Sequence, residues 1–308
     1  MAKHENLMQI GLSLPTSGKF ASRQAIEFIA SEAERIGCAS LWVLERLLRP
    51  TAPVDMDGRT GPMSESYACV FEPLETLSYV AARTENIKLG TSVIDAPFHN
   101  PVVIARRFAT LDQLSCGRVI AGLGQGWLRE EFVTTGIPMD TRGDRLEEFV
   151  ASLRAVWGPD PVSYAGRFYS IPPSQINPKP VQSNGPPIII AATKPRAIRR
   201  AARIGDGLNP LATGLRDLED ILKLFRGSVR EANRNPNGLQ VILRANNTLT
   251  EEPLPSPRQL LSGSKDQIIE DLVAVKQLGV DHVFFSFGHS GVPLDKQIHL
   301  MESIVGNF

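Results

Sequence analysis

The segment PPIIIAATKPRAIRRAARIG, residues 186–205, joins the two patterns that decide the fold. Its first half is a short apolar run without polar alternation, which is typical of a strand buried on both faces of a parallel sheet. Its second half is amphipathic and begins at Pro195, and proline is favoured in the first turn of a helix. The segment therefore predicts one βα unit, and HVFFSFG at 282–288 predicts another buried strand of the same kind.

The same alternation runs through all 308 residues. Eight βα units favour an α/β fold that closes as a single (β/α)₈ TIM barrel over residues 1–308, and a doubly wound open sheet is the alternative. The predicted strands are 8–15, 40–45, 87–94, 118–126, 186–193, 207–212, 241–249 and 282–288. The predicted helices are 21–37, 73–83, 101–115, 144–157, 195–205, 215–234, 264–279 and 294–305.

Three connections are too long for simple turns. Residues 46–72 follow the second strand and residues 127–143 follow the fourth, so both leave the carboxyl ends of strands, where such barrels carry their active sites. We interpret both as lid insertions, and surface loops without a function are the alternative. Residues 159–185 follow the fourth helix and contain VSYAGRFYSI, whose alternation around Ala-Gly predicts a small hairpin.

Composition limits the class of function and the cellular location. The chain has 33 basic and 33 acidic residues, which argues against a nucleic acid or an anionic membrane surface as the main partner. It contains no apolar run long enough for a membrane span, and residues 1–15 lack the apolar stretch of a secretory signal. Cys38, Cys69 and Cys116 are few and widely spaced, so we expect a protein of the reducing cytoplasm.

The glycines of RVIAGLGQGW, residues 118–127, raise the question of a phosphate-binding loop. A dinucleotide fingerprint has GxGxxG spacing on the first strand of its unit, whereas these glycines follow GxGxG on the fourth strand. A barrel offers two other reasons for glycine: a planar ring that approaches the backbone at the mouth, or narrow space inside the barrel. The stretch alone leaves both reasons open.

Further segments connect this stretch to a known superfamily. LGTSV at 89–93, NPVVIAR at 100–106 and ATLDQLSCGRVIAGLGQGW at 109–127 together closely resemble the luciferase-like monooxygenase superfamily, and the likeness continues at 188–207 and 262–285. This superfamily contains flavin-dependent monooxygenases and deazaflavin-dependent oxidoreductases on a TIM barrel. The likeness is greatest to the branch of F420-dependent oxidoreductases.

The resemblance implies an oxidoreductase that passes a hydride between F420, a deazaflavin, and a small organic substrate. It implies a cis peptide bond between Ser92 and Val93 that bulges behind the coenzyme ring and leaves the other ring face open. It also implies a phosphate site ahead of the helix near Pro195, where Thr193 either caps the helix or bonds a phosphate oxygen. The cofactor-binding residues that it implies are Glu45, Thr91, Ser92, Val93, Gly124, Ala191, Ala192 and Thr193.

The chain departs from the sugar dehydrogenases of this superfamily at two places. Where those enzymes frequently have Asp-His after the second strand, this chain has Glu45 and Arg46, and arginine cannot act as a general acid near neutral pH. Where they have glutamate after the fourth strand, this chain has Trp127, which predicts an apolar or aromatic wall. Both departures argue against sugar oxidation, and no second carboxylate is evident as a base. The catalytic residue is therefore unknown, with Glu45 and His99 as candidates.

The histidines predict no metal site, because they lack the spacing of metal ligands. His99 and His289 lie just beyond the third and eighth strands, where either could touch a ligand, although loop histidines are more often structural. Two other functions stay open: an FMN-dependent monooxygenase served by a separate flavin reductase, and a non-catalytic flavin-binding barrel. The resemblance also implies a homodimer. The sequence does not disclose the substrate or the direction of the reaction.

Overall fold

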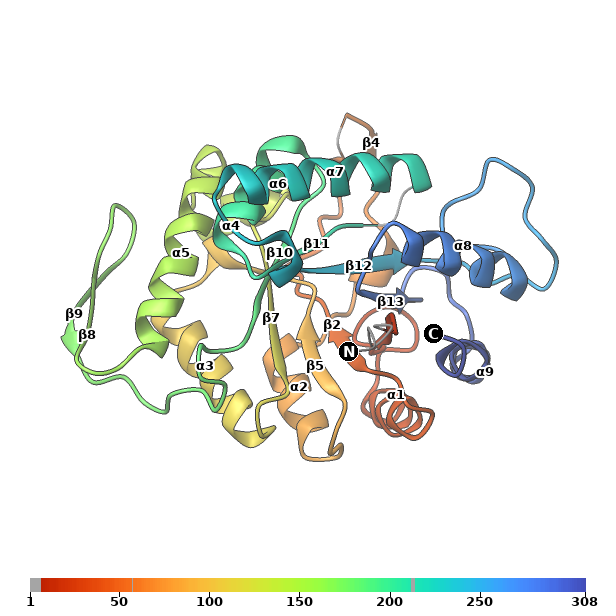
Figure 1. Ribbon diagram of the computed structural model, residues 1–308, viewed down its shortest axis with the longest axis horizontal. Helices are drawn as coiled ribbons and strands as arrows, with labels where there is room; N and C mark the ends of the chain where they lie inside the picture. The colour runs from red at the N-terminus through yellow and green to blue at the C-terminus, as the bar shows by residue number, and fades with distance from the viewer. Residues whose placement is uncertain (1–6, 57, 212–213) are drawn as a thin grey trace, which may run out of the picture.

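Eight parallel strands close into a barrel in the computed structural model of this protein, which describes residues 7–56, 58–211 and 214–308 (Figure 1). The strands pair in the order β10-β11-β12-β13-β1-β2-β5-β7, and a further pairing of β7 with β10 closes the ring. The predicted TIM barrel is therefore confirmed and the open sheet is excluded. The barrel strands are β1 (Gln9–Ser13), β2 (Ser40–Val43), β5 (Lys88–Thr91), β7 (Val119–Gly124), β10 (Ile188–Ala191), β11 (Gly207–Asn209), β12 (Gln240–Asn246) and β13 (His282–Ser286).

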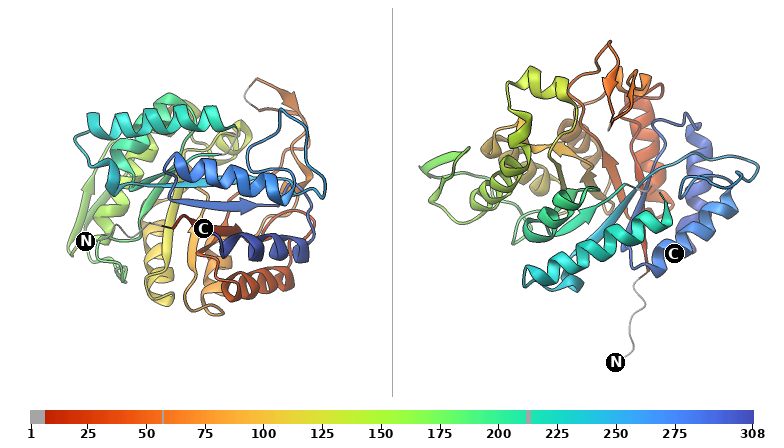
Figure 2. Two further views of the ribbon diagram at one scale, coloured as in Figure 1. Left: turned by 45° about the vertical axis from the view of Figure 1, so that its right-hand side comes forward. Right: turned by 90° about the horizontal axis from the view of Figure 1, so that it is seen from above.

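Helices cover the outside of the barrel, as the two further views in Figure 2 show. Side-chain caps fix several of their starts: Ser22 and Asn100 each accept hydrogen bonds from the first turn, and Ser264 forms a capping box with Gln267. The helices between the barrel strands and after the last one are α1 (Arg23–Arg35), α2 (Pro73–Ala81), α3 (Pro101–Leu114), α5 (Arg142–Trp157), α6 (Pro195–Ile204), α7 (Leu215–Glu231), α8 (Lys265–Gln277) and α9 (Leu294–Val305). All lie within a few residues of the predicted ranges.

Large apolar side chains fill the interior of the barrel. The Trp42 ring stacks on the Phe284 ring with their centroids 4.5 Å apart. Gly90 makes room for this pair, because a Cβ at Gly90 would lie 2.4 Å from the Trp42 ring. The interior is thus a packed core, and a ligand site has to lie at the mouth. The residues of this interior cluster are Trp42, Ile120, Ile189, Ile242 and Phe284.

The two insertions at the mouth contain elements that the sequence did not predict. The first carries a small hairpin, and the second carries the seven-residue helix α4, which is too short for its periodicity to stand out from a loop. Val54 and Met63 of the first insertion pack against Leu128 of the second. The elements of the insertions are β3 (Val54–Asp55), β4 (Thr60–Gly61) and η1 (Glu65–Tyr67) in the first, and α4 (Arg129–Thr135) and η3 (Met139–Thr141) in the second.

The hairpin predicted after the fourth barrel helix is present and projects from the side of the barrel, at the left of Figure 1. Its antiparallel strands are β8 (Val162–Ala165) and β9 (Ser170–Ser174). The remaining short elements are β6 (Ile94–Asp95), η2 (Ala96–Phe98) and η4 (Pro236–Gly238). Among the described residues, no helix has the length and apolar character needed to cross a membrane.

Candidate active site

A cavity of about 340 Å³ opens at the carboxyl ends of the barrel strands. This volume lies in the range of small-molecule sites. Thr91 is the one predicted cofactor-binding residue outside its wall, and it lies buried at the end of β5. The structure thus brings the predicted cofactor-binding residues of four separate strands to one place. Those that line the cavity are Glu45, Ser92, Val93, Gly124, Ala191, Ala192 and Thr193.

The peptide bond between Ser92 and Val93 is cis, as predicted. Ser92 is held through both of its polar groups by residues of distant strands. Its hydroxyl donates to Oδ1 of Asn209 at 2.7 Å, and its carbonyl oxygen accepts a hydrogen bond from Nη1 of Arg244 at 2.8 Å. Val93 lines the cavity from this fixed position.

The glycines of β7 allow that strand to pack against this segment. A Cβ at Gly122 would lie 1.7 Å from the carbonyl oxygen of Thr91, and the Thr91 hydroxyl bonds both the N–H and the carbonyl of Gly122. A Cβ at Gly124 would lie 2.5 Å from Cγ2 of Val93. Close packing therefore explains both glycines, and Gly124 also forms part of the cavity wall.

The two candidate catalytic residues, Glu45 and His99, lie in contact. Nε2 of His99 is 2.8 Å from Oε1 of Glu45, and Oε2 of Glu45 accepts a hydrogen bond from the backbone N–H of Asp95 at 2.7 Å. Burial opposes a positive charge on His99, but the hydrogen bond and the charge of Glu45 outweigh it and raise the pKa of His99. Glu45 lines the cavity and His99 does not, so His99 is connected to the cavity through its contact with Glu45.

Asp95 is a buried carboxyl group in the cavity wall that the sequence analysis did not single out. Its Oδ1 accepts a hydrogen bond from the backbone N–H of Gly126 at 3.0 Å. Burial, together with the negative charge of Glu45, raises the pKa of Asp95 to about 7. The expectation that no second carboxylate is available was therefore wrong. The available signal was an aspartate directly after the third predicted strand, at the end that forms the mouth.

Arg46 connects the two insertions across the mouth. Its Nη1 donates to Oε2 of Glu131 in α4 at 2.6 Å, and the backbone N–H of Leu47 donates to Oε1 of the same carboxylate at 2.8 Å. The Arg46 and Glu131 side chains are only 7% and 1% exposed, so they form a buried ion pair. The guanidinium also lies over the rings of Tyr67 and Trp127, 5.3 and 5.2 Å from their centroids. Trp127 lines the cavity, as the prediction of an aromatic wall requires.

His289 lies at the mouth, as expected, but it is not part of the cavity wall. Its Nε2 is 3.2 Å from the hydroxyl of Tyr67 and its Nδ1 is 2.6 Å from the hydroxyl of Ser66. Burial lowers the pKa of His289, and the positive charge of Arg244 lowers it further. Because Tyr67 does line the cavity, His289 positions Tyr67.

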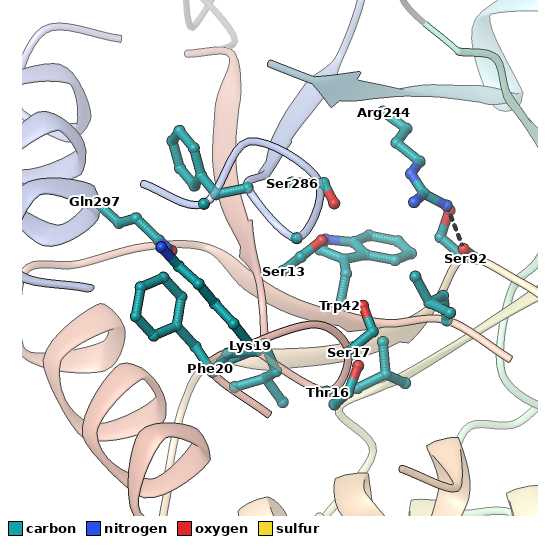
Figure 3. A pocket seen from close by; sticks show the side chains of 17 residues that line it. Ser13, Thr16, Ser17, Lys19, Phe20, Trp42, Ser92, Arg244, Ser286 and Gln297 are labelled. Carbon is teal, nitrogen blue, oxygen red and sulfur yellow. Dashed lines mark hydrogen bonds between the residues drawn. The ribbon is translucent and has the colours of Figure 1, made fainter. Parts of the chain in front are cut away.

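Arg244 is a second site residue that the sequence analysis missed. It lies on β12 and lines both the main cavity and a smaller one of about 30 Å³, and Figure 3 shows its guanidinium directed at Ser92. Its Nε donates to Oδ1 of Asn246 at 2.9 Å. A charged residue inside the otherwise apolar run VILRA was the signal that could have identified it.

The predicted phosphate site has one feature that differs from expectation. Thr193 does not cap α6: the N-cap residue is Lys194, and its side chain makes no capping hydrogen bond. Thr193 is exposed and lines the cavity together with Ala191 and Ala192. The first N–H groups of α6 therefore have no side-chain cap and remain available at the edge of the cavity. Within the described part of the chain, no group of three His, Cys, Asp or Glu side chains could hold a metal ion.

A family model described as luciferase-like monooxygenase matches residues 8–253. The chain belongs to the luciferase-like monooxygenase family. An uncharacterized protein of Mycobacterium tuberculosis is 30% identical over 279 residues, which is 87% of this chain and 95% of that protein. The predicted resemblance is therefore confirmed.

Relatives with a stated activity in this family use two coenzymes. The F420-dependent glucose-6-phosphate dehydrogenase of Amycolatopsis mediterranei is 34% identical over 61% of this chain and 53% of that enzyme. The FMNH₂-dependent dimethylsulfone monooxygenase of Pseudomonas putida is 33% identical over 42% of this chain and 37% of that enzyme. The prediction of an oxidoreductase is thus confirmed at the level of the family, and these relatives do not decide between the coenzymes.

A solved F420-dependent secondary alcohol dehydrogenase, in complex with an F420-acetone adduct, has the same fold. It matches 97% of this chain and 98% of its own with a TM-score of 0.80 at 18% identity. At this identity the likeness establishes the barrel architecture.

Proposed function

We propose that this protein is an oxidoreductase that binds F420 in the cavity beside Val93 and passes a hydride between the coenzyme and a small organic substrate. The observation that carries the proposal is the cavity of about 340 Å³, with Val93 and Gly124 in one wall and the uncapped start of α6 at its edge. The F420-dependent relatives and the same-fold dehydrogenase support the choice of coenzyme.

The chain's own residues would bind the coenzyme and exclude water, while the bound deazaflavin accepts or donates the hydride. Val93 would support one face of the ring, and Trp127 and Tyr67 would form the wall on the substrate side. The backbone N–H groups of Thr193 and of the first turn of α6 would bind the phosphate group.

Asp95 is the residue best suited to hold and move a proton during this reaction. It lines the cavity, and its raised pKa of about 7 lets it exchange a proton near neutral pH. Arg46 cannot take this role, because guanidinium stays protonated. Glu45 is already engaged at both carboxylate oxygens, so its role is to hold the Asp95 backbone and the His99 ring in place.

FMN-dependent monooxygenation, supported by a separate flavin reductase, is the second candidate. The relative from Pseudomonas putida is named as FMNH₂-dependent, and the same N–H groups at α6 suit the phosphate of FMN equally well. From the family resemblance we also propose a homodimer in the cytoplasm. Light scattering at micromolar protein concentration is expected to give the mass of two chains, and the mass of one chain would contradict the dimer.

Titration of the purified protein with each coenzyme tests the proposal. We expect F420 to bind with micromolar or tighter affinity and one-to-one stoichiometry, followed by its fluorescence, and FMN to bind at least tenfold more weakly. Preference for FMN would select the monooxygenase, and failure to bind either coenzyme would refute both functions and leave a non-catalytic barrel that has lost its coenzyme.

A pair of glycine variants locates the binding. Gly124→Ala displaces Val93, because the added Cβ would lie 2.5 Å from its Cγ2, so we expect F420 affinity to fall about tenfold. Gly227→Ala in α7 is the control, since its Cβ would meet nothing within 4 Å and alanine favours the helix. Equal affinities of the two variants would place the ring elsewhere.

A further inference from the structure

Arg244 is a cation in the cavity wall without an acidic partner among the residues that the structure describes. No carboxylate of the described residues lies within 4 Å of its guanidinium, whereas the other arginine of the same wall, Arg46, is paired with Glu131 at 2.6 Å. Burial lowers the pKa of Arg244, and the neighbouring charge of Arg46 lowers it further. A desolvated charge is costly unless a group of opposite charge approaches it, so the cavity favours an anion at this point.

The hydrogen bonds of Arg244 leave donors for such an anion. A guanidinium carries five N–H donors in one plane. Nε uses one on Asn246, and Nη1 uses one on the carbonyl oxygen of Ser92. These two bonds also hold the plane of the guanidinium fixed between β12 and the end of β5, which prepares the remaining donors for an oxyanion.

Two aromatic side chains in the same cavity wall as Arg244 are suited to pack against a flat, apolar ligand. Trp127 lines the same cavity and is 42% exposed, although tryptophan is usually well covered in a folded protein. Tyr67 forms another part of the wall and is fixed by His289. Arg46 lies over both rings and adds positive charge there, but its Nη1 already donates to Glu131.

We propose that the substrate is an organic acid whose carboxylate binds the free N–H groups of Arg244 and whose planar or apolar body packs against Trp127 and Tyr67. Only the claim that the bound acid is the substrate rests on the proposed function. The anion site itself belongs to the chain and can be measured without any coenzyme.

Calorimetric titration of the coenzyme-free protein with benzoate, and with benzamide as its neutral counterpart, tests the proposal. We expect benzoate to bind at least tenfold more tightly than benzamide, because a carboxylate brings a negative charge and two acceptor oxygens to the guanidinium, whereas the amide is neutral and has one acceptor oxygen. Equal affinity for the two compounds, or no binding of either, would overturn the proposal.

Three variants assign the binding to Arg244. Arg244→Gln keeps a donor for the Ser92 carbonyl and is expected to weaken benzoate at least tenfold while benzamide binding stays unchanged. Arg244→Lys restores part of the benzoate affinity, since it returns the charge without the planar fork. Arg216→Gln, an exposed position on α7, is the control and leaves both affinities unchanged. Unchanged benzamide binding and a single cooperative melting transition show that Arg244→Gln is folded. Benzoate affinity that is the same in Arg244→Gln and in wild type would overturn the assignment.

A second titration in the presence of saturating F420 separates the substrate from the coenzyme as the source of the anion. If Arg244 serves the substrate, benzoate binds with the same or higher affinity when F420 is present. Competition between benzoate and F420 would mean that Arg244 binds the coenzyme and would overturn the proposal. A protein that binds benzoate through Arg244 but does not bind F420 would refute the proposed function and keep the anion site.

Discussion

Trp42 and Trp127 are the same type of residue on the same barrel, yet their surroundings differ in every respect. Trp42 is fully buried inside the barrel and stacks on Phe284, and its indole N–H donates to the hydroxyl of Ser40. Trp127 is 42% exposed at the mouth and lies under the guanidinium of Arg46. The interior thus pairs its aromatic side chains with one another, while the mouth leaves part of an aromatic side chain exposed.

The histidines of the two regions show the same contrast. His282 in the interior has its Nε2 2.7 Å from the hydroxyl of Ser40, and burial lowers its pKa to about 3, so it is neutral. His99 at the mouth contacts a carboxylate that raises its pKa. The strands therefore build a neutral core inside the barrel and a charged site at its mouth.

We expect the largest change in stability from a substitution in the barrel interior. Trp42→Ala removes the largest interior side chain and is expected to lower the free energy of unfolding by about 3–5 kcal/mol. Trp127→Ala, the matched control, is expected to cost about 1 kcal/mol or less, since the side chain is partly exposed. Denaturant unfolding of both variants measures the difference. Similar losses would mean that the mouth and the interior are one packed unit.

The next effect concerns the charged pair that joins the insertions. Glu131→Gln leaves Arg46 buried without its counter-charge, so we expect a loss of about 3 kcal/mol in the free energy of unfolding. Glu251→Gln breaks an exposed ion pair with Lys296 and is expected to leave the free energy of unfolding nearly unchanged, because water and salt screen such a pair. A loss as small for Glu131→Gln, in the same denaturant titration, would contradict a buried pair across the mouth.

The smallest effect depends on pH and on Asp95. Because the pKa of Asp95 in the folded protein is raised to about 7, the folded state binds the proton more tightly than the unfolded state between about pH 4 and pH 7. The contribution of the carboxyl to stability is therefore present at low pH and is lost as the pH rises to about 7. Asp95→Asn carries no such charge, so its stability relative to wild type should increase by about 1–3 kcal/mol from pH 5 to pH 8. A relative stability that stays constant over this range, in melting curves of both proteins, would show that Asp95 is not desolvated.

The sequence predicted the scaffold far better than the chemistry of the site. Buried strands appear as short apolar runs and long helices follow a period of three to four residues, and a single segment displays either pattern, so PPIIIAAT and its helix could be predicted directly. The contact of Glu45 with His99, 54 positions apart, and that of Ser92 with Arg244, 152 positions apart, appear only when the barrel closes. The cis bond at Ser92 was expected from the resemblance to a family, and nothing in its local composition indicates it.

The helix start near Thr193 shows a second limit of prediction from sequence, which is the exact residue at which a helix begins. A threonine two residues before Pro195 suggested a cap, but the helix begins one residue later than such a cap needs, and Lys194 takes the N-cap position. A shift of one residue is below what propensity resolves, and it determines whether the N–H groups of the first turn are capped or free.

A crystal structure of the protein with F420 bound is the sharpest test, because the proposal concerns where the ring lies. We expect density for the ring in the cavity of about 340 Å³, in van der Waals contact with Val93 at about 3.5–4 Å, with the phosphate at the start of α6. A ring bound away from Val93, or a cavity that stays empty at saturating F420, would contradict it.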